Sequence, residues 1–95
     1  SRVPYGVRLT PHLLAQIDAA EAAVAPYVQG SLRVRYHGDV ARIEVGLDEI
    51  PSVLAHREEI VRAIKDTGFS YVTLDLGGYE MGSLNDVIDT DEEVK

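Results

Sequence analysis

Charged side chains recur at every second position on both sides of a short turn. Arg33 and Arg35 precede a Gly-Asp pair at 38–39, and Arg42 and Glu44 follow it. Glycine at the first position of a two-residue turn fixes the register of the flanking strands. That register places Arg35 opposite Arg42, and Arg33 opposite Glu44, on one face. Planar guanidinium groups bind phosphate or carboxylate oxygens in pairs. The spacing therefore predicts an anion site, or a surface buried against another domain.

A plainer interpretation stays open, because antiparallel sheets commonly have one hydrated polar face. The argument against it is electrostatic. Arg35 and Arg42 repel each other as direct cross-strand neighbours, and Glu44 is expected to relieve that repulsion only in part. Asp75, near the end of a third predicted strand, is expected on the same face.

The remaining polar residues carry weaker signals. His12, His37 and His56 are not spaced as metal ligands and are expected to be structural or exposed. The glycine-punctuated segment 77–82 fits a plain loop or a backbone nest for an anion, and Asp75 fits a ligand or a turn residue. The chain has no cysteine, which excludes a thiol nucleophile within it, and no Ser-His-Asp set can be assembled. No catalytic residue is therefore assigned within the chain, and metal ligands stay undetermined.

Five elements are needed to position these side chains. Thr10 is a helix N-cap followed by Pro11, and apolar residues at helical spacing predict a helix that Pro26 closes. Alternation with period two predicts strands over 32–37, 40–45 and 71–76. A second amphipathic helix is predicted over 50–64, with Gly68 as its C-terminal cap. The fold class is therefore α+β: a small α-β-β-α-β sandwich, a three-stranded sheet with two helices on one face.

The alternation also predicts which strand residues face the helices. They are all apolar: Leu32, Val34, Tyr36, Ala41, Ile43, Val45, Val72, Leu74 and Leu76.

Composition limits the partners. The 95 residues are 45% hydrophobic and 26% charged, which suits one ordinary globular domain. No apolar run is long enough to span a bilayer, so no membrane partner is expected. A net charge of −7 argues against a nucleic-acid partner. Residues 88–95 are expected to form a frayed acidic tail. The first residues have no apolar core of a secretory signal, so a cytoplasmic location is expected.

Several strings, taken in order, carry a resemblance. They are Ser-Arg-Val-Pro-Tyr-Gly at 1–6, Leu-Thr-Pro at 9–11, Ala-Ala-Glu at 19–21, Arg-Val-Arg-Tyr-His-Gly-Asp at 33–39, Ala-Arg-Ile-Glu-Val at 41–45, Gly-Phe-Ser-Tyr-Val-Thr-Leu-Asp-Leu at 68–76 and Gly-Ser-Leu-Asn at 82–85. Together they resemble the C-terminal part of the LarE-type ATP-dependent sacrificial sulfur transferases of the PP-loop (adenine nucleotide alpha hydrolase) superfamily. Residues 1–87 are thus expected to be the C-terminal α+β domain of such a transferase, without its N-terminal ATP-binding domain.

The resemblance implies a chemistry for the parent protein. Such enzymes adenylate a carboxylate of a pyridinium dicarboxylate mononucleotide and install sulfur as a thiocarboxylate, for nickel-pincer cofactor biosynthesis. Some members give up the sulfur of their own cysteine, just upstream of a string like that at 1–6; others use cysteines that hold an iron–sulfur cluster. ATP and Mg are expected in the parent and no cofactor in this chain. The expected partners are the parent's own PP-loop domain, a nucleotide-type substrate and further copies in a homo-oligomer.

The resemblance also assigns site residues. Ser1, Arg2, Arg33 and Arg35 match family residues that contact phosphate groups. Glu21 and Glu44 match acidic residues near substrate or metal. Two lines of reasoning, the hairpin register and the resemblance, therefore indicate Arg33 and Arg35.

Two hypotheses follow. The first is that the chain is a truncated or proteolysed piece of a sulfur transferase, inactive alone because it holds neither the ATP loop nor a sulfur donor. The alternative is a standalone non-catalytic module that uses its polar sheet face for protein binding or oligomerisation. They differ in what the gene encodes before Ser1: a PP-loop in the first case, a start codon in the second.

Overall fold

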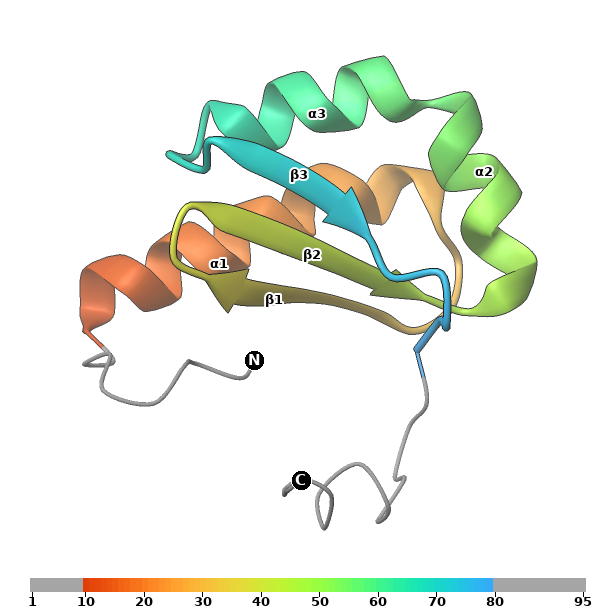
Figure 1. The fold of residues 1–95 in the computed structure, drawn as a ribbon, viewed down its shortest axis with the longest axis horizontal. Coiled ribbons are helices and arrows are strands. Elements are labelled where there is room, and N and C mark those ends of the chain that lie inside the picture. The colour runs from red at the N-terminus through yellow and green to blue at the C-terminus, as the bar shows by residue number, and fades with distance from the viewer. Residues whose placement is uncertain (1–9, 80–95) are drawn as a thin grey trace, which may run out of the picture.

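The computed structural model describes residues 10–79, which form a single layer of helices packed on a small sheet (Figure 1). In chain order the elements are α1 (Pro11–Val24), the 3₁₀ turn η1 (Ala25–Tyr27), β1 (Leu32–His37), β2 (Val40–Val45), the 3₁₀ turn η2 (Leu47–Glu49), α2 (Ile50–Ala55), α3 (Arg57–Lys65) and β3 (Tyr71–Leu74). The predicted α+β class is confirmed. Ser1, Arg2 and the acidic tail at 88–95 lie outside the described residues.

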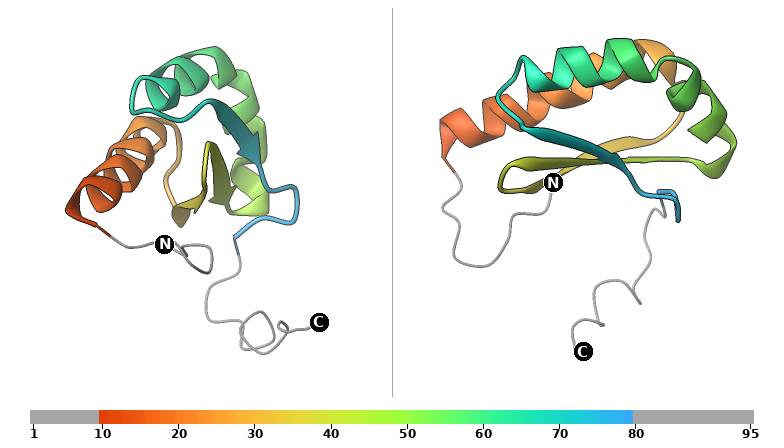
Figure 2. Two further views of the ribbon diagram at one scale, coloured as in Figure 1. Left: turned by 60° about the vertical axis from the view of Figure 1, so that its left-hand side comes forward. Right: turned by 45° about the horizontal axis from the view of Figure 1, so that its top comes forward.

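The sheet is mixed, with β2 in its centre. Its order is β1-β2-β3, in which β1 is antiparallel and β3 parallel to β2. Two consecutive parallel strands need a crossover connection, which α2 and α3 supply. Helices α1 and α3 contact each other and lie on the same side of the sheet (Figure 2). The opposite face of the sheet, the outer face, is covered by no helix of residues 10–79.

The core fills the space between helices and sheet. Val34, Ile43 and Val45 of the hairpin are at most 2% exposed, and they pack with Ile60 and Ile64 of α3. The predicted inward positions Leu32, Tyr36, Ala41, Val72 and Leu74 also lie in or against this cluster. Burial of these apolar side chains is the main stabilising term for the fold. No helix of residues 10–79 combines the length and apolar character that crossing a membrane would require.

The start of α1 follows the predicted capping pattern. The Thr10 side chain accepts a hydrogen bond from the backbone N–H of Leu13 at 3.1 Å. Pro11 occupies the first helical turn, where its missing N–H leaves no bond unmade. Pro26 lies in η1, so α1 ends at Val24, as the sequence predicts.

The second predicted helix is divided in two at His56. The backbone N–H of His56 is shared between the carbonyls of Ser52 and Val53, both at 3.2 Å. Its ring stacks on Tyr27, with centroids 4.5 Å apart, and Nδ1 lies 2.9 Å from the Ser52 carbonyl. The ring therefore holds a bend between the two helices. This bend lets Val53 of α2 and Ile60 of α3 both reach the core.

The third strand is shorter than predicted, and Leu76 does not face the core. β3 ends at Leu74, and Leu76 is 77% exposed. The Asp75 side chain accepts a hydrogen bond from the N–H of Gly77 at 2.9 Å, and its carbonyl accepts one from Gly78 at 3.1 Å. A turn closed by an aspartate thus replaces the last two strand positions.

Glu49 joins two distant loops and gives a first testable prediction. Its carboxylate accepts backbone hydrogen bonds from Gln29 at 2.7 Å and Gly30 at 2.6 Å. Glu49→Ala leaves both N–H groups without this acceptor, so we expect the free energy of unfolding to fall by about 1–2 kcal/mol. Urea denaturation measures the change. Asp18→Ala, which removes an exposed acid of α1, is the control; an equal change in both variants would contradict the role of Glu49.

Candidate functional site

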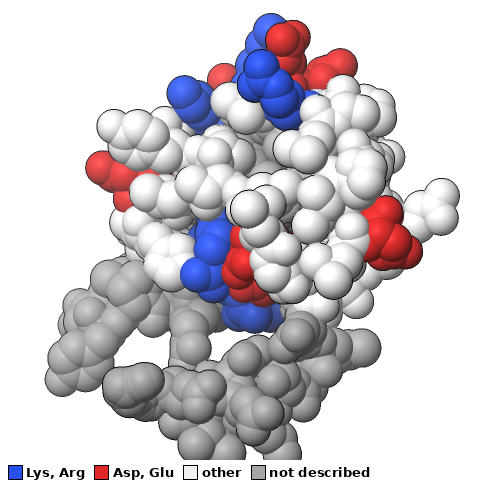
Figure 3. Space-filling view, turned by 45° about the vertical axis from the view of Figure 1, so that its right-hand side comes forward, with Lys and Arg blue, Asp and Glu red and all other residues white. Residues whose placement is uncertain are grey.

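The hairpin brings its arginines together on the outer face in the predicted register. Gly38 adopts a left-handed φ of +64°, and Arg35 pairs with Arg42 while Arg33 pairs with Glu44. A side chain other than glycine would be strained at that φ. Basic and acidic side chains lie side by side on this part of the surface (Figure 3). The predicted register and the predicted polar face are both confirmed.

Glu44 lies between the two cross-strand arginines and binds both of them. Its Oε1 accepts a hydrogen bond from Arg35 Nε, and its Oε2 accepts one from Arg42 Nη2, each at 3.0 Å. Glu44 is only 8% exposed, so these contacts are well shielded from water. A single carboxylate thus binds both guanidinium groups, one through each oxygen, while its one negative charge offsets only one of their two positive charges.

Asp75 adds a second carboxylate beside Arg42. Its Oδ2 lies 3.7 Å from Arg42 Nε, within ion-pair distance but too far for a hydrogen bond. Arg42 Nε is buried and has no hydrogen-bond partner among the described residues. The turn that ends β3 thus places Asp75 on the outer face, and it serves there as both turn residue and ion-pair partner.

Arg33 differs from the other two arginines. Within residues 10–79, no carboxylate lies within ion-pair distance of its guanidinium. Its Nη2 donates a hydrogen bond to the Tyr79 hydroxyl at 3.4 Å, and its Cζ lies 5.8 Å from the centroid of the Tyr79 ring. Arg33 therefore has no described carboxylate within ion-pair distance, and its described side-chain partner is the neutral Tyr79.

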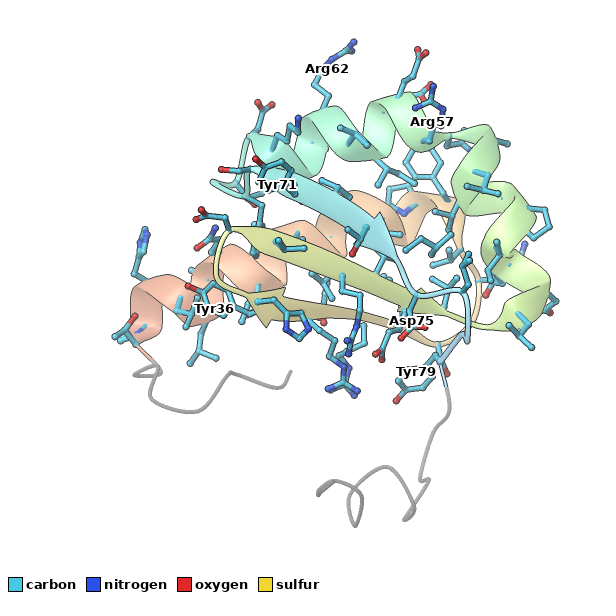
Figure 4. The ribbon with its side chains drawn as sticks, in the orientation of Figure 1. Tyr36, Arg57, Arg62, Tyr71, Asp75 and Tyr79 are labelled. Atoms are coloured by element: carbon cyan, nitrogen blue, oxygen red, sulfur yellow. The ribbon has the colours of Figure 1, made fainter. Side chains whose placement is uncertain are left out.

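Tyr79 is a residue of the site that the sequence does not reveal. It lies on the outer face with Asp75, at the opposite end of the sheet from Tyr36 (Figure 4). The contact with Arg33 spans 46 positions in the sequence. The glycines at 77 and 78 are the one signal in the sequence, since they indicate that the chain turns there, but not where it then runs.

Glu21 takes a structural contact. Its Oε2 accepts a hydrogen bond from the backbone N–H of Val34 at 3.0 Å, which joins α1 to the edge strand β1. Glu44, on the outer face, is occupied by two arginines. Among residues 10–79 there is no group of three or more His, Asp or Glu side chains that could hold a metal ion. The two glutamates therefore do not combine into a metal centre in the described part of the chain.

His37 stands at the end of β1 beside the arginines. Desolvation, and then the charges of Arg42 and Arg35, lower the pKa of His37 below its usual 6.5, although Glu44 acts in the opposite direction. The folded protein therefore binds a proton at His37 less readily than the unfolded chain does. The contribution of His37 to the free energy of unfolding is therefore full above pH 6.5, and it is lost as the pH falls toward the lowered pKa of the folded state.

This sign gives a second prediction. Between pH 7.5 and 5.5, wild type is expected to lose more stability than His37→Gln, because the variant has no imidazole to protonate in the unfolded state. Urea midpoints at the two pH values measure the difference. His12→Gln, at an exposed position of α1, is the control. Identical pH dependence of the wild type and the His37 variant would contradict the assignment.

A separate hollow lies along β3. It has a volume of about 180 Å³ and is open to solvent, and mostly apolar side chains from β2, α2, α3 and β3 line it, including Leu54, Val61 and Val72. Leu54 is 54% exposed. Unlike the charged outer face, this groove has one charged residue in its lining, Arg57.

Comparison with known proteins reveals related chains. No protein-family model matches the sequence. The chain is 42% identical over 88 residues to the pyridinium-3,5-bisthiocarboxylic acid mononucleotide synthase of Lactiplantibacillus plantarum, an alignment that covers 93% of this chain and 32% of the synthase. It is also 37% identical over 90 residues to an uncharacterized protein of Synechocystis, covering 93% of this chain and 34% of that protein. A third relative, an uncharacterized protein of Methanocaldococcus jannaschii, is 35% identical over 66 residues.

These findings support part of the predicted relationship. The chain is related to a segment of a LarE-like synthase, and it spans about a third of the length of the curated relatives that it matches. The name of the synthase specifies a mononucleotide that carries two thiocarboxylic acid groups.

Proposed function

We propose that the chain is the C-terminal, substrate-phosphate-binding and assembly domain of an ATP-dependent sulfur transferase. In this proposal the parent adenylates and thiolates a pyridinium dicarboxylate mononucleotide for nickel-pincer cofactor biosynthesis. The observation that carries it is the similarity to the bisthiocarboxylic acid mononucleotide synthase over 93% of the chain. The arginines of the outer face add a physical reason, because a mononucleotide has a phosphate for guanidinium groups to bind.

The roles within the site follow from its charges. Arg33, which has no described carboxylate within ion-pair distance, binds the phosphate of the substrate or of AMP. Arg35 uses its Nε–H to bind the Glu44 carboxylate. Its other guanidinium N–H groups are left to bind the same phosphate as Arg33. In the proposal Ser1 and Arg2, outside the described residues, complete the phosphate contacts. Glu21 and Glu44 stay near the substrate, in addition to their structural bonds.

The chain is expected to catalyse nothing alone. It has no cysteine to donate sulfur, and it contains no Ser-Gly-Gly-x-Asp-Ser string to bind ATP. In the proposal, ATP and Mg are bound by a PP-loop domain elsewhere in the parent. The described residues thus contribute substrate binding, charge neutralisation next to the nucleotide, and contact with that domain and with further copies in a homo-oligomer.

The coding sequence on the N-terminal side of Ser1 tests the proposal directly. A PP-loop with the pattern Ser-Gly-Gly-x-Asp-Ser encoded upstream in the same reading frame is the expected result. A start codon immediately before Ser1 would contradict it, and the intact mass of the native protein provides an independent check.

The second candidate function is a non-catalytic protein-binding or oligomerisation module. The specific observation in its favour is the apolar groove along β3, with the exposed Leu54 at its margin. The outer face is less suited to this role than the sequence suggests, because Glu44 and Asp75 already pair with two of its arginines. The start codon immediately before Ser1 is the outcome that this alternative requires.

A further inference from the structure

We propose that Tyr79 is a positioning residue, which holds the guanidinium of Arg33 ready for a phosphate monoester without cancelling its charge. This inference rests on the proposed function, since it concerns the same phosphate, but it adds a residue that neither the hairpin pattern nor the comparisons indicate. The three outer-face arginines differ in the chemistry of their partners.

Two of the arginines have anionic partners. Arg35 and Arg42 both bind Glu44 at 3.0 Å, and Arg42 also lies 3.7 Å from Asp75. A carboxylate orients a guanidinium well, but it also lowers the net charge available to an incoming anion. These two arginines therefore hold the sheet face together more than they attract a ligand.

Arg33 has a neutral partner instead. The Tyr79 hydroxyl accepts one N–H from Nη2, and the Tyr79 ring centroid lies 5.8 Å from Cζ. A guanidinium has five N–H donors, so four are left for other acceptors. An aromatic ring attracts a cation through its quadrupole and carries no charge of its own. Tyr79 thus restricts the motion of Arg33 without placing a negative charge beside it.

Tyr79 is held independently of Arg33. Its backbone N–H donates to the Val45 carbonyl at 2.8 Å. Gly78, just before it, has a φ of +81°, and a Cβ at that position would lie 2.8 Å from Leu47 Cδ2. Gly78 therefore allows a close approach that returns the chain to the end of β2. These backbone contacts hold the main chain at Tyr79 independently of Arg33, so that the side chain of Tyr79 starts from a fixed point.

The ligand class follows from the donors that remain. A phosphate monoester presents several anionic oxygens, which match two parallel N–H groups on one edge of a guanidinium. Because the ring supports Arg33 from one side, these N–H groups are already oriented before the ligand binds. Less side-chain entropy is then lost on binding.

The test compares the binding of AMP by the 95-residue chain and four variants, followed by NMR titration. Arg33→Gln is expected to abolish saturable binding. Tyr79→Leu, which removes both ring and hydroxyl, is expected to weaken binding about fivefold. Tyr79→Phe keeps the ring and is expected to restore most of the affinity. Tyr71→Leu is the matched control, because Tyr71 is 63% exposed on β3, and it should bind as the wild type does.

Two further measurements separate positioning from a merely structural role. The urea midpoint of Tyr79→Leu should match that of Tyr71→Leu, and the Arg33 Nε resonance should move in Tyr79→Leu before any ligand is added. If Tyr79→Leu binds AMP as the wild type does while Arg33→Gln does not, the positioning role fails and the proposed function stands. If the wild type and Arg33→Gln give the same titration, the phosphate site itself fails, and the role of Tyr79 fails with it.

Discussion

Glu44→Ala is expected to lower the free energy of unfolding by about 3 kcal/mol, because it removes both charge-assisted hydrogen bonds and leaves two partly buried arginines facing each other. The side chains of Arg35 and Arg42 are 24% and 36% exposed, so water screens part of their repulsion, and the expected loss lies at the lower end for broken buried pairs. For a domain of this size the melting temperature should fall by at least about 12 °C. Calorimetry and urea denaturation both measure it.

The controls isolate the shared carboxylate. Asp18→Ala removes an equal charge from an exposed position of α1 and should change stability little. Glu44→Gln keeps the shape and one acceptor oxygen, so it should fall between the wild type and Glu44→Ala. In the variant with Arg35→Met and Glu44→Met together, the loss should be smaller than the sum of the two single effects. Equal stability of Glu44→Ala and the wild type would show that the Glu44 carboxylate does not stabilise the outer face.

Arg33→Ala in the intact parent protein is expected to abolish sulfur transfer or to raise the substrate requirement about a hundredfold. The physical reason is the loss of the one outer-face cation without a described carboxylate partner, and a bidentate contact to phosphate of this kind is among the strong hydrogen bonds of proteins. A hundredfold change corresponds to about 2.7 kcal/mol of binding free energy. Steady-state kinetics with varied mononucleotide substrate measures it.

The matched control is Arg62→Ala. Arg62 projects from α3, away from the outer face (Figure 4), so its loss removes one positive charge without touching the site. Arg33→Ala should also leave the urea midpoint nearly unchanged, since no described ion pair depends on it. Unchanged turnover by a normally folded Arg33→Ala protein would count decisively against the proposed function.

The two substitutions together divide the outer face into two parts with different tasks. Glu44, with Arg35 and Arg42, is expected to affect stability most. Arg33, with Tyr79, is expected to affect ligand binding most. The arginines of the two parts, Arg33 in one and Arg35 and Arg42 in the other, lie close together on β1 and β2. For this reason the alternating pattern of arginines in the sequence predicts one anion site and does not separate the two parts.

The local features of the fold could be predicted from the sequence because each is encoded within a few residues. The cap at Thr10 and Pro11 specifies where α1 begins. The turn glycine at position 38, with its positive φ, sets the register of the hairpin. Strict alternation then assigns each hairpin side chain to the core or to the outer face, because a register shift of one residue would exchange the two faces.

Tertiary structure decided what depends on contacts between distant segments. The bend at His56 exists because its ring stacks on Tyr27, from a different element. β3 stops at Leu74 because the Asp75 turn directs the chain back to Val45. Glu44 reaches both arginines by side-chain geometry that strand pairing alone does not specify.

The charge of the site illustrates the same division. The sequence by itself determined that Arg33, Arg35 and Arg42 share a face, since turn and period require it. The packed structure decided which of the three has no described carboxylate within ion-pair distance. Glu44 lies between Arg35 and Arg42, whereas Tyr79 contacts Arg33. The physical reason is range: backbone periodicity acts between neighbours in sequence, whereas ion pairs and ring contacts form between side chains that meet only after the chain has folded.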